Sequence, residues 1–307
     1  MKRMLGIKIR ASALVMLITL LVGRIGNYFL SENRAVNFLV VGVDNASWNT
    51  DVISVVRLDP NIGRISYVQI PRDTYCNLEV HKNKINHIFS EARAKGKNSE
   101  DAVSDLKSFL TEELSIKLDG HILIDGETFC KLVDSIGGVD VELSEDLVLY
   151  NGDKPVMTLS KGSNHLDSHA AILFVRHRAG YLRGDLDRLE MQNVFIRGLF
   201  DTLMNKVSAT DLFRVADILK ECETDIPTRA LISIYSNRKT FASTHPIGSV
   251  LPGVAMKGRN GVWYYALNRR ACDELISTLF SVERGSFDKG MHFLNASDQD
   301  FKDVYFR

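Results

Sequence analysis

The sequence predicts a single α/β/α layered domain with a mixed central sheet, placed after an N-terminal membrane anchor. Strand-like and helical segments alternate along the chain, which is typical of α/β layer folds. The first three strand-like segments are joined by short connections, so antiparallel pairs enter the sheet and make it mixed. The chain has 307 residues, 45% of them hydrophobic, which is enough for one large core.

The N-terminus predicts the anchor. Basic residues within 1–10 precede an apolar run at 11–22, and no acidic residue occurs before Glu32. Extended past Arg24 to residue 30, the run reaches the ~20 residues that a membrane span needs. We therefore predict a cytoplasmic tail (1–10), a transmembrane anchor (11–30), a stalk (31–36) and an extracellular domain (37–307) in a single-pass protein of the cell membrane. A cleaved signal peptide is the alternative.

Three predicted strands follow the anchor, at 37–43, 51–58 and 64–70. The first is an almost continuous apolar run, the second is rich in β-branched residues, and a Pro-Asn-Ile-Gly turn separates the second from the third. Consecutive strands of such a meander alternate in direction. The meander therefore brings four charged residues to one edge of the sheet, namely Asp44, Asp51, Arg72 and Asp73.

The later elements follow from hydrophobic periodicity and helix-capping residues. Up to residue 143 they are a helix ending near 95, a helix from 99, a strand at 116–124, a helix at 127–136 and a strand at 139–143. Beyond it they are a short helix before 176, a helix at 185–204, helical segments at 208–237, strands at 239–244 and 262–267, and a helix at 269–280.

The segment from Phe174 to Gln192 is the richest in arginine. It contains Arg176, Arg178, Arg183 and Arg188, and arginine presents a planar fork of donors that fits phosphate oxygens. Asp185, Arg188 and Gln192 are spaced so that they share one helix face. The segment thus predicts a site for an anion with several oxygens, such as a pyrophosphate. A solvated helix whose arginines pair with acidic neighbours is the alternative.

Composition and motifs exclude several classes. Lys plus Arg equals Asp plus Glu at 38 each, so no global field attracts nucleic acid. The chain lacks a P-loop, a G-x-G-x-x-G, a G-x-S-x-G and an H-E-x-x-H motif, so nucleotide-dependent kinase chemistry, serine hydrolysis and zinc proteolysis have no support. The four cysteines, Cys76, Cys130, Cys222 and Cys272, form no zinc-binding pattern, and they fit either buried thiols or a disulfide.

Asp44 and Asp51 are candidate Mg²⁺ ligands. Mg²⁺ favours one or two carboxylates together with phosphate oxygens, and the meander places both carboxylates at the same edge. A turn role for Asp44 and a capping role for Asp51 are the alternatives.

Six strings in order resemble the LytR–CpsA–Psr family: FLVVGVD, TDVISVV, QIPRDT, KINH, DSIGGVDVEL and VRHRAGYLRGDLDR. They cover about 37–203, and HPIGSVLPG and WYYAL add a weaker likeness near the C-terminus. The resemblance implies a membrane-anchored extracellular enzyme with an α/β/α core. Such an enzyme transfers a glycopolymer, such as wall teichoic acid or capsule, from a polyprenyl-pyrophosphate carrier to peptidoglycan.

The resemblance also implies roles for individual residues. Asp44 and Asp51 match the family's magnesium ligands. The predicted catalytic residues are Arg72, Arg176, Arg178, Arg188, Asp185 and Asp73, and the predicted substrate-binding residues are Lys84, Gln192 and Arg183. Met191 and Asn49 stand where family members often have arginine, which removes possible phosphate donors. The polyprenyl tail requires an apolar tunnel, for which aliphatic residues between Ile116 and Val141 are candidates.

The predicted partners are therefore a polyprenyl-pyrophosphate-linked glycan, a peptidoglycan acceptor and the membrane, without nucleic acid. Two other functions fit the same residues. One is a non-catalytic, membrane-tethered binder of lipid-linked glycans. The other is a hydrolase that acts on the same pyrophosphate with water as the acceptor.

Overall fold

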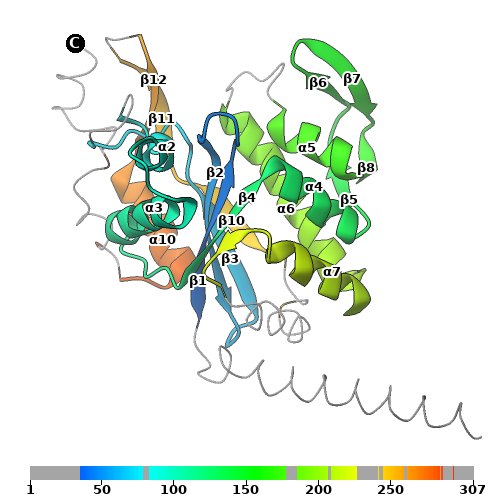
Figure 1. Cartoon of the computed structure of the whole chain (residues 1–307), viewed down its shortest axis with the longest axis horizontal. Coiled ribbons are helices and arrows are strands. Elements are labelled where there is room, and N and C mark those ends of the chain that lie inside the picture. Colours follow the sequence, from blue (N-terminus) through cyan, green and yellow to red (C-terminus); the bar gives the residue numbers. More distant parts are fainter. Residues whose placement is uncertain are drawn as a thin grey trace, which may run out of the picture.

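The computed structural model of the chain describes residues 35–78, 83–177, 185–206, 209–226, 241, 245–258, 261–283, 285 and 293. A six-stranded sheet in the order β10-β3-β2-β1-β4-β9 forms the centre (Figure 1). Its strands are β1 (Val36–Val43), β2 (Thr50–Asp59), β3 (Arg64–Gln69), β4 (Gly120–Asp125), β9 (Glu223–Thr224) and β10 (Ile247–Val250). β1 pairs antiparallel with β2 and parallel with β4. The prediction of an α/β domain with a mixed central sheet is confirmed.

Helices lie on both sides of this sheet (Figure 1). One side carries α2 (His87–Ala94), α3 (Ser99–Leu114) and α10 (Arg269–Phe280); the other carries α4 (Gly126–Ser135), α5 (Ser168–Arg176), α6 (Asp185–Asn205) and α7 (Ala209–Leu219). Three two-stranded sheets complete the described fold: β5 (Val139–Leu143) with β8 (Gly162–Leu166), β6 (Leu147–Asn151) with β7 (Lys154–Leu159), and β11 (Gly253–Lys257) with β12 (Trp263–Leu267).

Side-chain caps fix where several helices begin. The Asp125 carboxylate accepts a hydrogen bond from the Thr128 N–H at the start of α4 (2.7 Å), and Asp167 accepts from the Ala170 N–H at the start of α5 (2.8 Å). Each cap satisfies an N–H group that has no partner inside its helix. Asp125 is the last residue of β4, and Asp167 follows β8 directly, so both caps place their helices relative to strands.

The predicted meander is confirmed, and the strand at 262–267 and the helix at 269–280 also correspond to observed elements. The strands β6 to β11 were not predicted. Most residues of β7 are exposed, so its sequence lacks an apolar alternation, and β9 has only two residues. Of the strand predicted at 239–244 only Phe241 is described, and it is helical. The helical prediction at 208–237 is wrong beyond α7, where β9 follows, and 227–237 lie outside the described residues.

The two faces of the central sheet have different surroundings. On one face, residues such as Leu39, Val41 and Val55 are fully buried in a cluster with side chains of α2, α3 and α10. On the other face, residues such as Val40 and Val56 are only partly buried and line a cavity beneath α4 to α7. Side chains of a strand alternate between its two faces. Consecutive residues such as Val40 and Val41 of β1 therefore contribute to the cavity lining and to the closed core, respectively.

Two other predictions concern cysteines and the membrane. All four cysteines are free thiols, which decides against the disulfide alternative. Burial raises the pKa of Cys76 to about 12, so this thiol stays protonated at neutral pH.

Within the described ranges, no helix is both long enough and apolar enough to cross a bilayer. The predicted tail, the predicted anchor and residues 31–34 of the stalk lie outside those ranges.

Neighbouring valines of β1 provide a test of the two-faced sheet. We expect Val41→Ala to lower the free energy of unfolding by about 2 kcal/mol or more, because it removes two methyl groups from a closed core. We expect Val40→Ala to cost less than about 1 kcal/mol, because a cavity already lies beside this side chain. Equilibrium urea unfolding of both variants measures the difference. Equal losses would mean that the cavity face is as tightly packed as the other.

Candidate functional site

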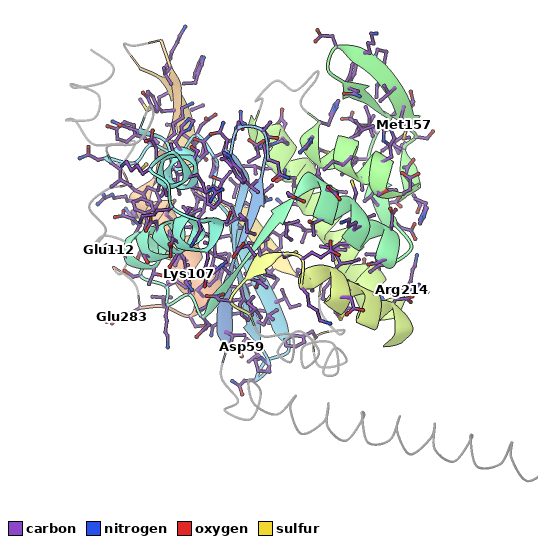
Figure 2. The ribbon with its side chains drawn as sticks, in the orientation of Figure 1. Asp59, Lys107, Glu112, Met157, Arg214 and Glu283 are labelled. Atoms are coloured by element: carbon purple, nitrogen blue, oxygen red, sulfur yellow. The ribbon has the colours of Figure 1, made fainter. Side chains whose placement is uncertain are left out.

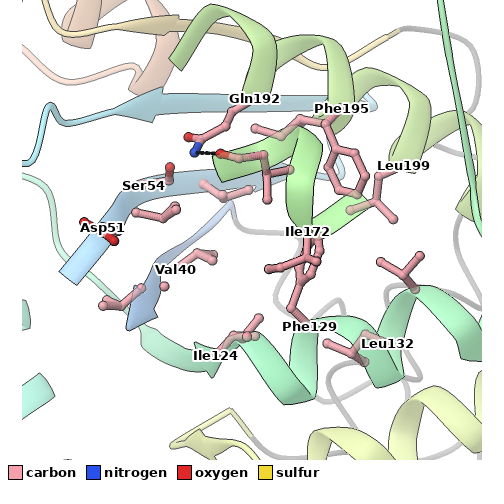
Figure 3. A pocket seen from close by; sticks show the side chains of 18 of the residues that line it. Val40, Asp51, Ser54, Ile124, Phe129, Leu132, Ile172, Gln192, Phe195 and Leu199 are labelled. Carbon is pink, nitrogen blue, oxygen red and sulfur yellow. Dashed lines mark hydrogen bonds between the residues drawn. The ribbon is translucent and has the colours of Figure 1, made fainter. Parts of the chain in front are cut away.

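A cavity of about 500 Å³ lies between the inner face of the sheet and helices α4 to α7. Most of its lining is apolar, with Phe129 and Leu132 from α4, and Phe195 and Leu199 from α6. Figure 3 shows Asp51 at one end of this lining and Leu199 toward the other. The charged lining residues are Asp44, Asp51, Asp125, Arg176 and Arg188. The cavity is therefore amphipathic along its length, and its charged end is called the mouth below.

The acidic side of the mouth is formed by Asp44, directly after β1, and Asp51, within β2. The Ser47 hydroxyl donates to Asp44 Oδ2 (2.7 Å) and holds the pKa of Asp44 below its ordinary value. The N–H groups of Ala46 and Ser47 and the charge of Arg176 act in the same direction, against the effect of burial. Asp44 is thus ionised at neutral pH.

The basic side of the mouth is formed by Arg176, the last residue of α5, and Arg188, on α6. Arg176 is exposed, and its Nη2 lies close to Gly126, at 3.1 Å from the position that a Cβ would occupy there. Arg188 is only 2% exposed, and its Nη2 donates to the backbone oxygen of Asp51 (3.0 Å). The contact with Asp51 joins the acidic and basic sides of the mouth.

Three other predicted residues are not part of the cavity lining, namely Arg72, Asp73 and Lys84. Arg72 Nη1 contacts Asp51 Oδ1 at 2.5 Å, and Lys84 Nζ contacts Asp73 Oδ1 at 2.7 Å. The backbone of Asp73 accepts a hydrogen bond from the Tyr265 N–H of β12 (2.9 Å). The meander thus brings Arg72 to Asp51 as predicted, whereas Asp73 is engaged by Lys84.

Gln192 follows Arg188 by one turn of α6 and lines the cavity. Its Nε2 donates to the Val175 carbonyl (3.0 Å), and its Oε1 accepts from Gln69 Nε2 (3.2 Å). Two predicted residues, Arg178 and Arg183, lie outside the described residues. Asp185 begins α6, but its side chain is likewise outside the described part.

Asp125 and Asn45 at the mouth were not predicted. Asn45 Nδ2 donates to Asp125 Oδ2 (2.8 Å), which ties the loop after β1 to the start of α4. Burial raises the pKa of Asp125, but hydrogen bonds from Thr128 and Asn45 outweigh it and lower the pKa overall. A signal was present in the sequence, because Asp125 ends a strand and caps the next helix. The parallel pairing of β4 with β1 then places Asp125 opposite Val43, the residue before Asp44.

Met191 and Asn49, the two positions where family members often have arginine, each have a structural role in this chain. Met191 packs against the hydrophobic cluster formed by helices α4 to α6 and strands β5 to β8, and it does not line the cavity. Asn49 accepts a hydrogen bond from the Asp44 N–H through its backbone oxygen (3.0 Å). Met191 therefore occupies a packed position away from the cavity. Asn49, by contrast, belongs to the loop between Asp44 and Asp51 at the mouth.

The lining also tests the predicted tunnel residues. Of the predicted aliphatic residues, Ile124, Leu132, Val133 and Ile136 line the cavity, and the aromatic Phe129 joins them from the same range. Others from the same range, Ile116, Leu118, Leu123, Val139 and Val141, are buried in the hydrophobic clusters instead. The remaining apolar lining comes mainly from β1, β2 and helices α5 to α7, which the prediction did not include.

The mouth fits the donor set that Mg²⁺ requires. Asp44 and Asp51 present hard carboxylate oxygens at one end of the cavity, and a Mg²⁺ ion held by these two carboxylates would need water and phosphate oxygens to complete its shell. Among the residues that the structure describes, no group of three or more His, Cys, Asp or Glu side chains is placed to hold a metal. A two-carboxylate site that needs a phosphate ligand is consistent with this arrangement.

The chain is similar to known proteins over most of its length. The LytR_cpsA_psr family model matches residues 22–281. TagU of Oceanobacillus iheyensis is 27% identical over 252 residues, covering 79% of this chain and 74% of that protein. TagU of Bacillus cereus is 27% identical over 256 residues, covering 81% and 80%. Both relatives are named polyisoprenyl-teichoic acid–peptidoglycan teichoic acid transferase.

Solved structures share the fold. B. subtilis TagV superposes with a TM-score of 0.66 at 22% identity, covering 83% of this chain and 98% of that one. TagT bound to LIIa-WTA superposes with a TM-score of 0.64 at 22% identity, covering 81% and 90%. The family model spans most of the chain, including every residue described at the mouth, and the chain therefore belongs to the LytR–CpsA–Psr family.

Proposed function

We propose that this protein transfers a glycopolymer phosphate, such as wall teichoic acid, capsule or a similar polysaccharide, from a polyprenyl-pyrophosphate carrier to peptidoglycan. The observation that carries the proposal is the amphipathic cavity, whose apolar interior ends at Asp44, Asp51, Arg176 and Arg188. A long hydrocarbon joined to a pyrophosphate has the same division of polarity. The relatives named as teichoic acid transferases support the same substrate class.

In the proposed reaction the polyprenyl chain occupies the apolar interior, which leaves the pyrophosphate at the mouth. Arg176 and Arg188 bind its oxygens, and Arg72 acts through Asp51 by holding that carboxylate in place. The proposed set of phosphate-binding and supporting residues also includes Arg178, Arg183, Lys84 and Gln192. Mg²⁺ held by Asp44 and Asp51 would neutralise part of the pyrophosphate charge.

A sugar hydroxyl of peptidoglycan attacks the phosphorus attached to the glycan. A new P–O bond forms, the bond to the bridging oxygen breaks, and polyprenyl phosphate leaves with that oxygen. Such a transfer depends mainly on positioning and on charge stabilisation. The hydroxyl proton needs an acceptor, and because Asp73 is paired with Lys84 we assign this role to Asp185 at the start of α6.

We also propose that the protein is held in the cell membrane by residues 11–30, with 1–10 in the cytoplasm and the catalytic domain outside. The basic residues before the apolar run support this orientation. An extracellular domain tethered in this way meets both the lipid carrier and the peptidoglycan acceptor.

Arg176 offers a direct test of the phosphate-binding role, because it is exposed and its loss leaves the core intact. We expect Arg176→Ala to lower the Mg²⁺-dependent release of polyprenyl phosphate by about a hundredfold, since it removes a cation that stabilises the developing charge. Arg214→Ala is the matched control, because Arg214 is an exposed arginine of α7 that lies at the outer edge of the molecule (Figure 2). Its release rate should equal that of the wild type.

The products of the same assay separate the three functions. With lipid-linked glycan and peptidoglycan present, a transferase yields polymer bound to peptidoglycan. A hydrolase yields free glycan phosphate, and a non-catalytic binder yields neither above the background of Arg176→Ala. Either of the last two results would overturn the transferase proposal.

The apolar lining offers a second test. Leu199 lies in the part of the lining far from Asp51 (Figure 3), so Leu199→Trp should block the path of a long tail. We expect this variant to lose most of its turnover of a full-length polyprenyl substrate and to retain its turnover of a short isoprenyl analogue. Leu199→Met, which nearly conserves volume, should behave as the wild type with both. Equal effects of Leu199→Trp on long and short substrates would place the tail elsewhere.

A further inference from the structure

Two buried polar residues interrupt the apolar face of the sheet that lines the cavity. Ser54 on β2 and Gln69 on β3 are partners in the antiparallel register, so their side chains are neighbours on the same face. Both line the cavity, and they are only 5% and 1% exposed. Their neighbours on this face include the apolar residues Val40, Val52 and Ile65, so Ser54 and Gln69 form a small polar patch within an apolar surface.

Each of the two residues presents a polar atom that is unpaired within the described part of the chain. These atoms are the Ser54 hydroxyl oxygen and Gln69 Oε1. A buried polar group without a hydrogen bond destabilises a fold, and an apolar side chain of similar size would avoid that cost. The pair therefore indicates a role in binding rather than in folding.

The orientation of the Gln69 amide follows from a relay of hydrogen bonds. Gln192 Nε2 donates to the Val175 carbonyl, which can only accept, so Gln192 Oε1 must face Gln69. Gln69 Nε2 donates to that oxygen at 3.2 Å. The relay leaves Gln69 Oε1 as an acceptor beside the Ser54 hydroxyl. An acceptor at this place repels a phosphate oxygen and favours a neutral donor.

The pair lies one step inside the mouth. Gln192, which holds Gln69, follows Arg188 by one helical turn, a rise of about 6 Å along α6. In Figure 3 Ser54 and Gln192 lie at the end of the lining where Asp51 is found. A pyrophosphate whose tail points inward would therefore have its lipid-side phosphate closest to Ser54 and Gln69.

We propose that Ser54 and Gln69 hold one water molecule against the lipid-side phosphate of the bound carrier, an inference that rests on the proposed function. The water accepts a hydrogen bond from the Ser54 hydroxyl, donates one to Gln69 Oε1 and donates the other to a phosphate oxygen. Three such bonds are usual for a buried water. Ser54 and Gln69 are thus positioning residues, and they fix how deep the pyrophosphate enters.

The test uses three serine variants of the full chain. Ser54→Ala removes the hydroxyl, and Ser54→Thr retains it. Ser66→Ala is the matched control, because Ser66 is also a buried β3 serine without a hydroxyl partner in the described residues, but it lies on the opposite face. Calorimetry measures the affinity of each variant for farnesyl pyrophosphate with Mg²⁺, and urea unfolding measures the stability.

We expect Ser54→Ala to bind farnesyl pyrophosphate about tenfold more weakly, with an unfolding midpoint equal to or above that of the wild type. Ser54→Thr and Ser66→Ala should bind as the wild type does. Unchanged affinity in Ser54→Ala, or a fall in stability that accompanies the loss of affinity, would overturn the inference. Failure of the wild type itself to bind would instead contradict the proposed function.

A crystal structure of the wild type with farnesyl pyrophosphate tests the water itself. The expected density is one water within hydrogen-bond distance of the Ser54 hydroxyl, Gln69 Oε1 and a phosphate oxygen. A phosphate oxygen in direct contact with Ser54 would overturn the inference.

Discussion

The site depends on a buried cation, Arg188, held at the end of an apolar cavity. Its side chain is almost fully enclosed, and a charge in such a place requires compensation by hydrogen bonds and opposite charge. The backbone oxygen of Asp51 provides a hydrogen bond, and the Asp51 carboxylate is in turn paired with Arg72. Three segments that are distant in sequence, α6, β2 and the loop after β3, are thereby joined at the mouth.

The cavity exists because the two faces of the sheet are used differently. Helices α2, α3 and α10 pack against one face in a closed hydrophobic cluster, whereas α4 to α7 leave space over the other face. Strand alternation supplies apolar side chains to both faces, so the space is mostly apolar, apart from Ser54 and Gln69 and the charged residues at the mouth. The core and the cavity lining are thus two sides of the same three strands, and Asp44 and Asp51 lie where β1 ends and β2 begins.

Much of this could be predicted from local patterns. The meander strands are continuous apolar or β-branched runs bounded by turns, and strand direction alone placed Asp44, Asp51 and Arg72 at one edge. Asp125 was missed because its position depends on a parallel pairing between β1 and β4, which are far apart in sequence. Ser54 and Gln69 were missed for a different reason. A single polar residue within an apolar strand carries no signal until its burial and its cross-strand neighbour are known.

We propose, above all, that the cavity binds a polyprenyl pyrophosphate with its phosphates at the mouth. A crystal structure of the protein with such a carrier and Mg²⁺ tests this most directly. We expect phosphate oxygens within hydrogen-bond distance of Arg176 and Arg188, and a tail that passes Phe129 toward Leu199. A carrier whose phosphates lie away from both arginines, or whose tail lies outside the cavity, would contradict it.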